Sequence, residues 1–534
     1  MSAPRAARPA GVGLAALVSV ALLAPLGVDP ASAEVDGPPL LQQTVAAEQA
    51  LDVAQDVLSG RSTELSATLA LRELAVRQND LSATDARAAE ALLARPNGGA
   101  TGRDLPAAVW AGVEAPKSVA GDGCSSVVPL CVHWTNQGND APPSADGNSN
   151  QVPDWVETTL ADMETVWTYE IDTLGYRPPL TDERASIDND GVNFDVYLSD
   201  VGSKGLYGYC AVDDSRTKIG YRYGDYAAYC VLDNDFARDE FPTNSPRENL
   251  QVTAAHEFFH AIQFAYDALE DVWFMEGSAA WIEDEVFDSV NDNRQYLRSS
   301  QFRRPNLPLD ASRGLGVYGT WGYLRYLSER FGPDVIRKAW ERADFSPGAP
   351  DDFSLQALDR VISRQSSFHS VMGDFGLVIN EPKAFLDEGG AFPSATLERF
   401  SLGRVGATTG WQSYGLDHTS YAPVEVRPGR SVSASARLKV IVDAPGRATA
   451  PEARVMVVRD NGSVGATKAV RLNRKGNGST SVPFAPGAVK HVVVALGNTS
   501  IDFRRCYSGT TNYSCGGGVP LDDNAKHWFK AIVR

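Results

Sequence analysis

The stretch from Ser245 to Asp267, SPRENLQVTAAHEFFHAIQFAYD, decides how the middle of this chain folds. Its first residues are typical of a helix N-terminus: the Ser245 side chain can cap free amide groups, Pro246 fits the first turn, and Glu248 completes a capping box. Apolar residues then recur at spacings of three and four, at Val252, Ala255, Phe259, Ile262 and Ala265. This periodicity predicts an amphipathic helix with one face against a core.

The same helix carries two of the seven histidines of the chain, His256 and His260. Because they are four residues apart, both imidazoles leave one face of the helix and can reach a single ion. Glu257 lies beside that face, where a carboxylate can act as the general base of a metal-dependent hydrolase. The alternative is a buried helix whose histidines only form hydrogen bonds.

A catalytic zinc needs a third protein ligand and a position left for water. The segment 273–281, WFMEGSAAW, predicts a second helix rich in small residues, with Glu276 in its first turn. This Glu-Gly-x-Ala segment after HEFFH resembles the gluzincin zinc metallopeptidases, and in particular a group of secreted, mostly uncharacterised bacterial metalloproteases. The resemblance implies that His256, His260 and Glu276 bind zinc and that Glu257 is the base.

The resemblance implies further roles. Fifteen residues separate His260 from Glu276, slightly fewer than in the better known gluzincins, so the connecting loop must be shorter. Glu283 is the alternative third ligand, or a carboxylate that orients a histidine, or a solvated charge. Tyr318 is the candidate for stabilising the oxyanion, and the predicted strand 194–199 is the candidate edge that pairs with the substrate backbone.

A second metal site is predicted from oxygen ligands at EF-hand spacing. The ligands would be Asp146, Asn148, Asn150, Val152 through its carbonyl, Asp154 and Glu157. Gln151 stands where such loops have glycine, and Pro153 follows, so the alternative is an Asx-rich turn that caps the next helix. A weaker calcium candidate comprises Asp188, Asn189, Asp190 and Asp195.

The N-terminus predicts export. Arg5 and Arg8 precede an apolar stretch over 11–26 and the tripeptide 31–33, Ala-Ser-Ala, which is typical of a signal peptide spanning residues 1–33. No other stretch reaches the length of a membrane span, so we expect a secreted protein with no membrane contact after signal removal. Six cysteines in an exported chain indicate disulfides, with the local pairs Cys124–Cys131, Cys210–Cys230 and Cys506–Cys515 favoured among fifteen arrangements.

Composition sets the broad class. A length of 534 residues suits about three domains, and a hydrophobic share of 43% is ordinary for globular protein. The net charge of −18 argues against nucleic acid and anionic membranes as partners, because binding phosphates needs clustered Lys and Arg. The expected partner is a protein or peptide substrate, and the sequence makes no prediction of oligomeric state.

The predicted fold class is α+β, with a zincin-like catalytic domain between a helical N-terminal region and a C-terminal β-sandwich. Residues 34–117 are a helical region that either covers the active site or assists folding before removal, or stays attached. Residues 118–412 form the zinc metalloprotease domain. Residues 413–534, with short β-branched alternations between turns, form the sandwich and resemble the accessory domains of secreted bacterial peptidases.

These observations predict a secreted endopeptidase that uses Zn²⁺, with Ca²⁺ as a second ion. The alternative is a secreted binding or adhesion protein, in which a catalytically silent zinc domain is a scaffold and the sandwich recognises a surface. A scaffold needs only metal ligands, whereas hydrolysis also needs a base, so Glu257 favours the enzyme.

Overall fold

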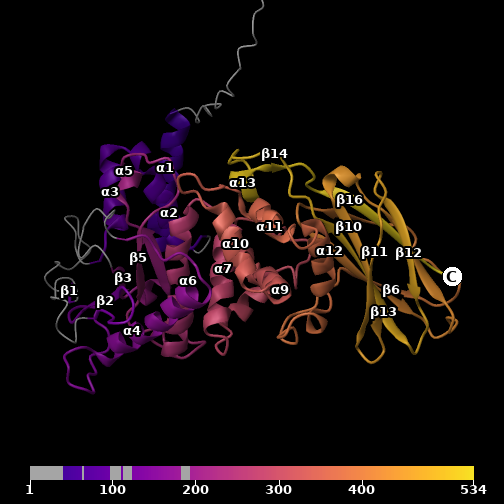
Figure 1. Ribbon diagram of the computed structural model, residues 1–534, viewed down its shortest axis with the longest axis horizontal. Coiled ribbons are helices and arrows are strands. Elements are labelled where there is room, and N and C mark those ends of the chain that lie inside the picture. Colours follow the sequence, from indigo (N-terminus) through magenta and orange to yellow (C-terminus); the bar gives the residue numbers. More distant parts are fainter. Residues whose placement is uncertain (1–39, 63–64, 97–109, 112–122, 182–192) are drawn as a thin grey trace, which may run out of the picture.

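The computed structural model describes residues 40–62, 65–96, 110–111, 123–181 and 193–534. It confirms the α+β class: within these ranges the chain has helices and four separate sheets. Figure 1 shows helices α1–α3 with one sheet at one end, helices α7 and α9–α12 in the middle, and two further sheets at the other end. The expected signal peptide and the acidic run 188–190 of the weaker calcium candidate lie outside the described residues.

The first sheet has the strand order β1-β2-β3-β5-β4. Its strands are β1 (Trp110–Ala111), β2 (Leu130–Thr135), β3 (Phe194–Ser199), β4 (Gly208–Val212) and β5 (Ala228–Asp233). The prediction that 194–199 forms an edge is wrong, because β3 pairs in parallel with β2 on one side and with β5 on the other. Among the described residues, β4 is the edge strand next to β5, and it runs antiparallel to β5.

Helices cover both faces of this sheet. Successive side chains of a strand point to opposite faces, so each strand has buried residues on both sides. Tyr197, Tyr209 and Tyr229 are buried on one face, against the N-terminal helices. Val196 and Leu198 face the opposite side and share a core with Phe258. The helices concerned are α1 (Leu40–Leu58), α2 (Ala67–Arg77) and α3 (Ala83–Leu93) on the first face, and α4 (Asp154–Trp167) and α6 (Pro246–Asp267) on the second.

The predicted central helix is confirmed as α6. The Ser245 side chain accepts from the Glu248 amide, and the Glu248 side chain accepts from the Ser245 amide, which completes the capping box. Helix α6 packs against α7 (Val272–Val286). On α7, Gly277 allows Thr320 to approach the helix closely, because a Cβ at position 277 would lie 2.1 Å from Thr320 Oγ1.

The remaining helices enclose α6 and α7 in one large apolar core that contains four fully buried tryptophans. They are η3 (Thr168–Thr173), η6 (Asp292–Ser299), α8 (Gly316–Gly319), α9 (Trp321–Phe331), α10 (Asp334–Ala343), α11 (Ser354–Ile362) and α12 (Phe368–Val378). The short helix α5 (Ser215–Lys218) instead packs against α2. None of the helices in the described ranges has both the length and the apolar character needed to cross a membrane.

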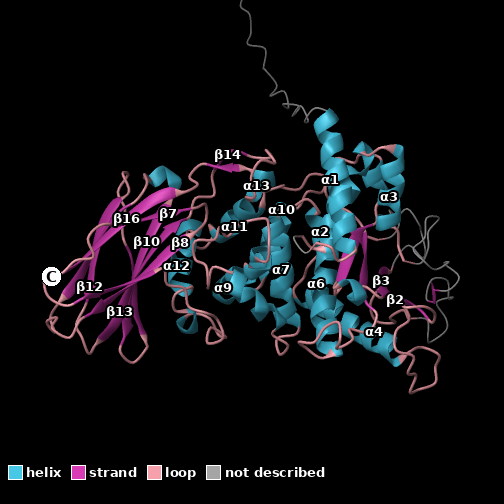
Figure 2. Ribbon diagram, turned by 180° about the vertical axis from the view of Figure 1, so that it is seen from behind, coloured by secondary structure: helices cyan, strands magenta, loops and turns pink. Residues whose placement is uncertain are grey.

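Towards the C-terminus, two sheets enclose a second core built mainly of valine. Their orders are β11-β10-β13-β8-β6 and β12-β9-β16-β7, and Figure 2 shows them in magenta, at the opposite end from the first sheet. The strands are β6 (Glu398–Leu402), β7 (Gln412–Leu416), β8 (Tyr421–Pro428), β9 (Arg437–Asp443), β10 (Pro451–Arg459), β11 (Val464–Ala469), β12 (Asn477–Pro483), β13 (Val489–Asn498) and β16 (Ala525–Val533). The first of them, β6, begins before residue 413 and pairs in parallel with β8.

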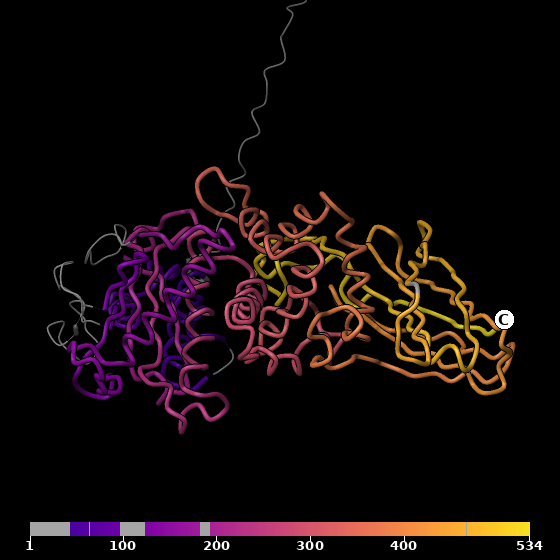
Figure 3. The backbone as a smooth tube through the Cα atoms, turned by 60° about the horizontal axis from the view of Figure 1, so that its bottom comes forward, coloured from indigo at the N-terminus to yellow at the C-terminus, as the bar shows by residue number. Residues whose placement is uncertain are grey.

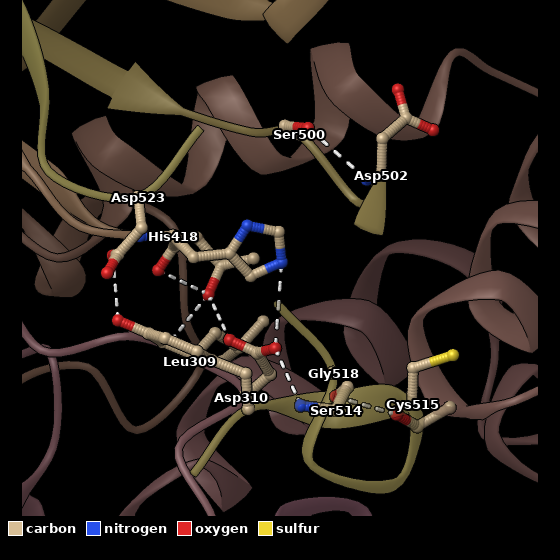
Figure 4. Close-up of polar contacts among 12 residues, drawn as sticks. Leu309, Asp310, His418, Ser500, Asp502, Ser514, Cys515, Gly518 and Asp523 are labelled. Carbon is tan, nitrogen blue, oxygen red and sulfur yellow. Dashed lines mark hydrogen bonds and ion pairs between the residues drawn. The ribbon is translucent and has the colours of Figure 1, made fainter. Parts of the chain in front are cut away.

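A loop near the C-terminus returns from these sheets to the helices (Figure 3). It carries the short elements β14 (Phe503–Arg505), α13 (Ser514–Gly517) and β15 (Val519–Pro520). Figure 4 shows Asp310 between His418 and Ser514: its carboxylate accepts from the Ser514 amide at 3.1 Å and lies 3.6 Å from His418 Nε2. Ser514 Oγ also accepts from the indole of Trp273 in α7, at 2.9 Å. The loop therefore fastens the sheets to the helix that carries Glu276.

The structure contains the three disulfides Cys124–Cys131, Cys210–Cys230 and Cys506–Cys515, which is the pairing favoured from the sequence. The second joins β4 to β5 beside α6. The third closes the returning loop, whose Cys515 amide donates to Asp271 at the start of α7.

Candidate metal centre

Three of the residues predicted to bind metal lie together. His256 Nε2 is 3.3 Å from Glu276 Oε2, and His260 Nε2 is 3.6 Å from the same oxygen. Their potential ligand atoms all lie within 4.8 Å of one another. The two imidazole rings, with centroids 4.9 Å apart, are inclined by 80°, so they approach this point from different directions. Helices α6 and α7 thus bring two nitrogens and one carboxylate to a single point.

The other ring nitrogen of each histidine has its own partner. His256 Nδ1 lies 2.7 Å from Glu283 Oε1, and His260 Nδ1 lies 2.7 Å from Gln263 Oε1. The Gln263 amide nitrogen donates to the Met275 carbonyl, which leaves its oxygen to accept from His260. A histidine that donates from Nδ1 presents the lone pair of Nε2 to a metal, so these contacts orient both ligands.

The site is buried, and its charges are unequally compensated. Burial raises the pKa of Glu276, but the imidazoles of His260 and His256 outweigh it and hold the pKa below its ordinary value. Burial raises the pKa of Glu283 to about 7, although His256 opposes this. Among the described residues, His260 Nε2 and Glu283 Oε2 have no hydrogen-bond partner, which is costly for buried polar atoms.

A divalent cation fits these observations, because a cation bound between the three ligand atoms would itself be the partner that His260 Nε2 lacks. Zinc favours nitrogen donors together with a carboxylate, and sites with three protein ligands are typical of catalytic zinc. His256, His260 and Glu276 are the residues that would hold it.

The two residues predicted to act on substrate border this point. Glu257 is 8% exposed, and its Oε2 accepts a hydrogen bond from Thr68 Oγ1 at 2.8 Å. The ring of Tyr318 stacks on His256, with centroids 6.0 Å apart and planes at 29°, and on Tyr296. Burial and the charge of Glu276 raise the pKa of Tyr318 well above its ordinary value, so its hydroxyl keeps its proton.

The chain matches no known family model and no curated protein. The site combines two oriented imidazoles, one buried carboxylate, a second carboxylate beside them and a phenol that keeps its proton. A set of this kind can hold a Lewis acid, accept a proton from water and donate a hydrogen bond to a developing negative charge.

The predicted calcium ligands gather around one exposed loop. Asp146 accepts from the amides of Asn150 and Gln151, and the side-chain amides of Asn148 and Asn150 both donate to Glu157. Gln151 adopts a φ of 73°, so the position that normally requires glycine makes its sharp turn with glutamine. The Val152 side chain is buried, while Asp154 accepts from the Gly147 amide. Calcium binding here stays a prediction.

Asp195, of the weaker calcium candidate, lies on β3 and is buried. Its carboxylate makes an ion pair with Arg95 and lies 2.6 Å from His133 Nε2. These contacts use both of its oxygens inside the protein.

Three residues of the site were missed in the sequence. Gln263 could have been found, because it is one turn beyond His260 on the same helix face. Ser66 and Thr68 had no such signal. They belong to the start of α2, and Ser66 Oγ donates to Glu276 Oε1 from 210 residues away in sequence.

Proposed function

We propose that this protein is a secreted zinc-dependent endopeptidase. The observation that carries the proposal is the convergence of His256, His260 and Glu276 on one point, together with Glu257, which follows His256 in the sequence. The carboxylates Glu276 and Glu257 have different roles in this scheme, since the first belongs to the ligand set and the second stays free to take a proton. The fold that this arrangement favours is a zincin-like catalytic domain.

Zinc, when bound, supplies a Lewis acid that polarises a carbonyl and acidifies water. Glu257 accepts the proton of the attacking water at a carboxylate oxygen and delivers it to the departing amine. The protonated hydroxyl of Tyr318 donates a hydrogen bond to the oxyanion. Glu283 and Gln263 keep the two imidazoles in the orientation that the ligand set requires.

The substrate class follows from β4. As the edge strand next to α6, it offers backbone groups that an extended peptide can pair with, whatever its side chains. Three disulfides fit an oxidising compartment, which supports secretion. We include Ca²⁺ in the loop 146–157 as a structural ion, because its oxygen ligands have the spacing of an EF-hand-type loop.

The test compares Glu257→Gln with the unchanged protein, both as residues 34–534 loaded with zinc. Each is assayed on an unfolded fluorescent protein substrate, as the intact chain and after cleavage at a specific protease site introduced between residues 97 and 109. We expect Glu257→Gln to lower the hydrolysis rate of the cleaved form by about 10³-fold, within the range known for general bases, with an unchanged zinc content.

The matched control is Glu341→Gln, which removes an exposed carboxylate on α10 that pairs with Arg337. It should leave the rate unchanged. Equal activity of the Glu257→Gln variant would exclude Glu257 as the base. Zinc binding without hydrolysis in every form would favour the alternative function, a zinc-stabilised binding protein.

A further inference from the structure

The first turn of α2 lies against both parts of the candidate active site. Ser66 Oγ donates to Oε1 of the ligand Glu276, and Thr68 Oγ1 donates to Oε2 of the base Glu257, at 2.8 Å. Ser66 is also the N-cap of α2 and accepts from the Leu69 amide. One short segment, 66–68, therefore binds the ligand and the base at the same time.

Thr68 also binds the edge strand. Its hydroxyl accepts a hydrogen bond from the backbone amide of Cys210, on β4, at 2.9 Å. A peptide substrate that extends along β4 would use the same amide, because the edge is where the backbone groups of this strand are free to pair. Thr68 thus bridges the edge strand and Glu257, which are the two groups that a scissile peptide must lie between.

Little space remains beside this turn. The cavity next to Glu276 and Tyr318 measures about 20 Å³, and Leu65 and Ser66 form part of its wall. A volume of this size accommodates about one water molecule. A peptide cannot enter while α2 is in place.

The turn is firmly anchored in this position. Arg72 Nη1 donates to the Glu270 carbonyl at 3.1 Å, and Leu69, Leu71 and Leu74 are fully buried. Behind them, Arg95 forms buried ion pairs with two aspartates near the first sheet. The segment 66–68 is therefore held by the whole helical layer and not only by its two hydroxyl contacts.

We propose that residues 40–96 are an intramolecular inhibitor, whose turn 66–68 occupies the position of the substrate. The inhibitor and the cleft are parts of one chain, so the intact protein is a latent form. This inference rests on the proposed peptidase function, and its test has a readout that does not require hydrolysis.

The test uses the full chain with Thr68→Glu, which places a second carboxylate against Glu257 and should displace the turn by repulsion. We expect a chromogenic chelator, 4-(2-pyridylazo)resorcinol, to extract zinc at least 10-fold faster than from the unchanged protein. Hydrolysis of an unfolded protein substrate by the uncleaved chain should rise by at least 10-fold.

A milder variant guards against misfolding. Ser66→Ala removes the N-cap of α2 and the contact to Glu276, whereas Ser82→Ala removes only the equivalent N-cap of α3, which accepts from the Asp85 amide. Zinc extraction should therefore be faster from the Ser66→Ala variant than from the Ser82→Ala variant. Circular dichroism tests whether all three variants are folded.

Each outcome decides one of the two proposals. Faster extraction without hydrolysis by any form would support the cover and reject the peptidase. Hydrolysis by the unchanged, uncleaved chain at the rate of Thr68→Glu would overturn the inhibitor and leave the peptidase intact. Unchanged extraction in both Thr68→Glu and Ser66→Ala would also overturn the inhibitor.

Discussion

The helices around the candidate metal centre and the two C-terminal sheets have cores of different kinds. Between the sheets the core is built mainly from apolar residues such as Val424, Val440 and Val492. Between α6 and α7, histidines and carboxylates are buried among aromatic side chains. In the part of the chain that the structure describes, every group of acidic and histidine side chains close enough to share an ion lies outside the sheets. The ion that we propose therefore belongs to the helical region and not to the two C-terminal sheets.

The largest expected effect that follows is on metal removal. At a free zinc concentration 1,000 times the dissociation constant, binding stabilises the folded state by about 4 kcal/mol. We expect a chelator to lower the hydrogen-exchange protection of amides in α6 and α7 by up to this amount, and to leave β10 and β13 largely unchanged. Native-state exchange followed by mass spectrometry measures both regions in one sample. Equal loss in both would show that they unfold as one unit.

We expect the two C-terminal sheets to lose stability at low pH. His527 faces the interior of its sheet, and burial lowers its pKa from 6.5 to about 4. The folded state therefore prefers the neutral ring. The contribution of His527 to the stability of the folded state is fully present above pH 6.5, decreases as the pH falls, and is lost below about pH 4. The difference corresponds to about 3 kcal/mol. We expect His527→Gln to remove most of this dependence in acid unfolding monitored at the sheets.

The pKa of His418, which lies beside Asp310 and Asp522, shifts in the opposite direction. Burial alone would lower its pKa, but Asp310 and Asp522 outweigh burial and raise it above 6.5. Its contribution is therefore complete below pH 6.5 and is lost as the pH rises through the raised value. His418→Gln should leave the acid-induced loss in place. If it abolished that loss, His527 would not be the group responsible.

The smallest effect tests how the metal ligands are held. Gln263→Leu removes the acceptor of His260 Nδ1 while keeping a side chain of similar volume. We expect zinc affinity to fall by about 10- to 100-fold, as for other partners of metal-bound histidines, in a competition titration. The control is Gln301→Leu, a buried glutamine whose amide instead donates to the Leu307 carbonyl. An unchanged affinity in the first variant would mean that Gln263 does not orient His260.

What the sequence could predict was local. Ser245 and Glu248 cap α6 within one turn, and His256 and His260 share a face because of their spacing, so both followed from short-range geometry. The disulfide pairs also close short loops. The assignment of 194–199 as an edge failed because strand order depends on partners far away in the chain. The contacts of Ser66 and Thr68 could not be found for the same reason: they join residues about two hundred positions apart.

The contact between Trp273 and Ser514 also sets an order of events. These residues are 241 positions apart, and at ribosomal rates of about 5–20 residues per second the second emerges roughly 10–50 s after the first. During that interval the Trp273 indole can donate to Ser354 Oγ but not to Ser514 Oγ, and Asp271 lacks the amides of Cys515 and Gly516. The returning loop therefore reaches the helix that presents Glu276 only after most of the chain has been made.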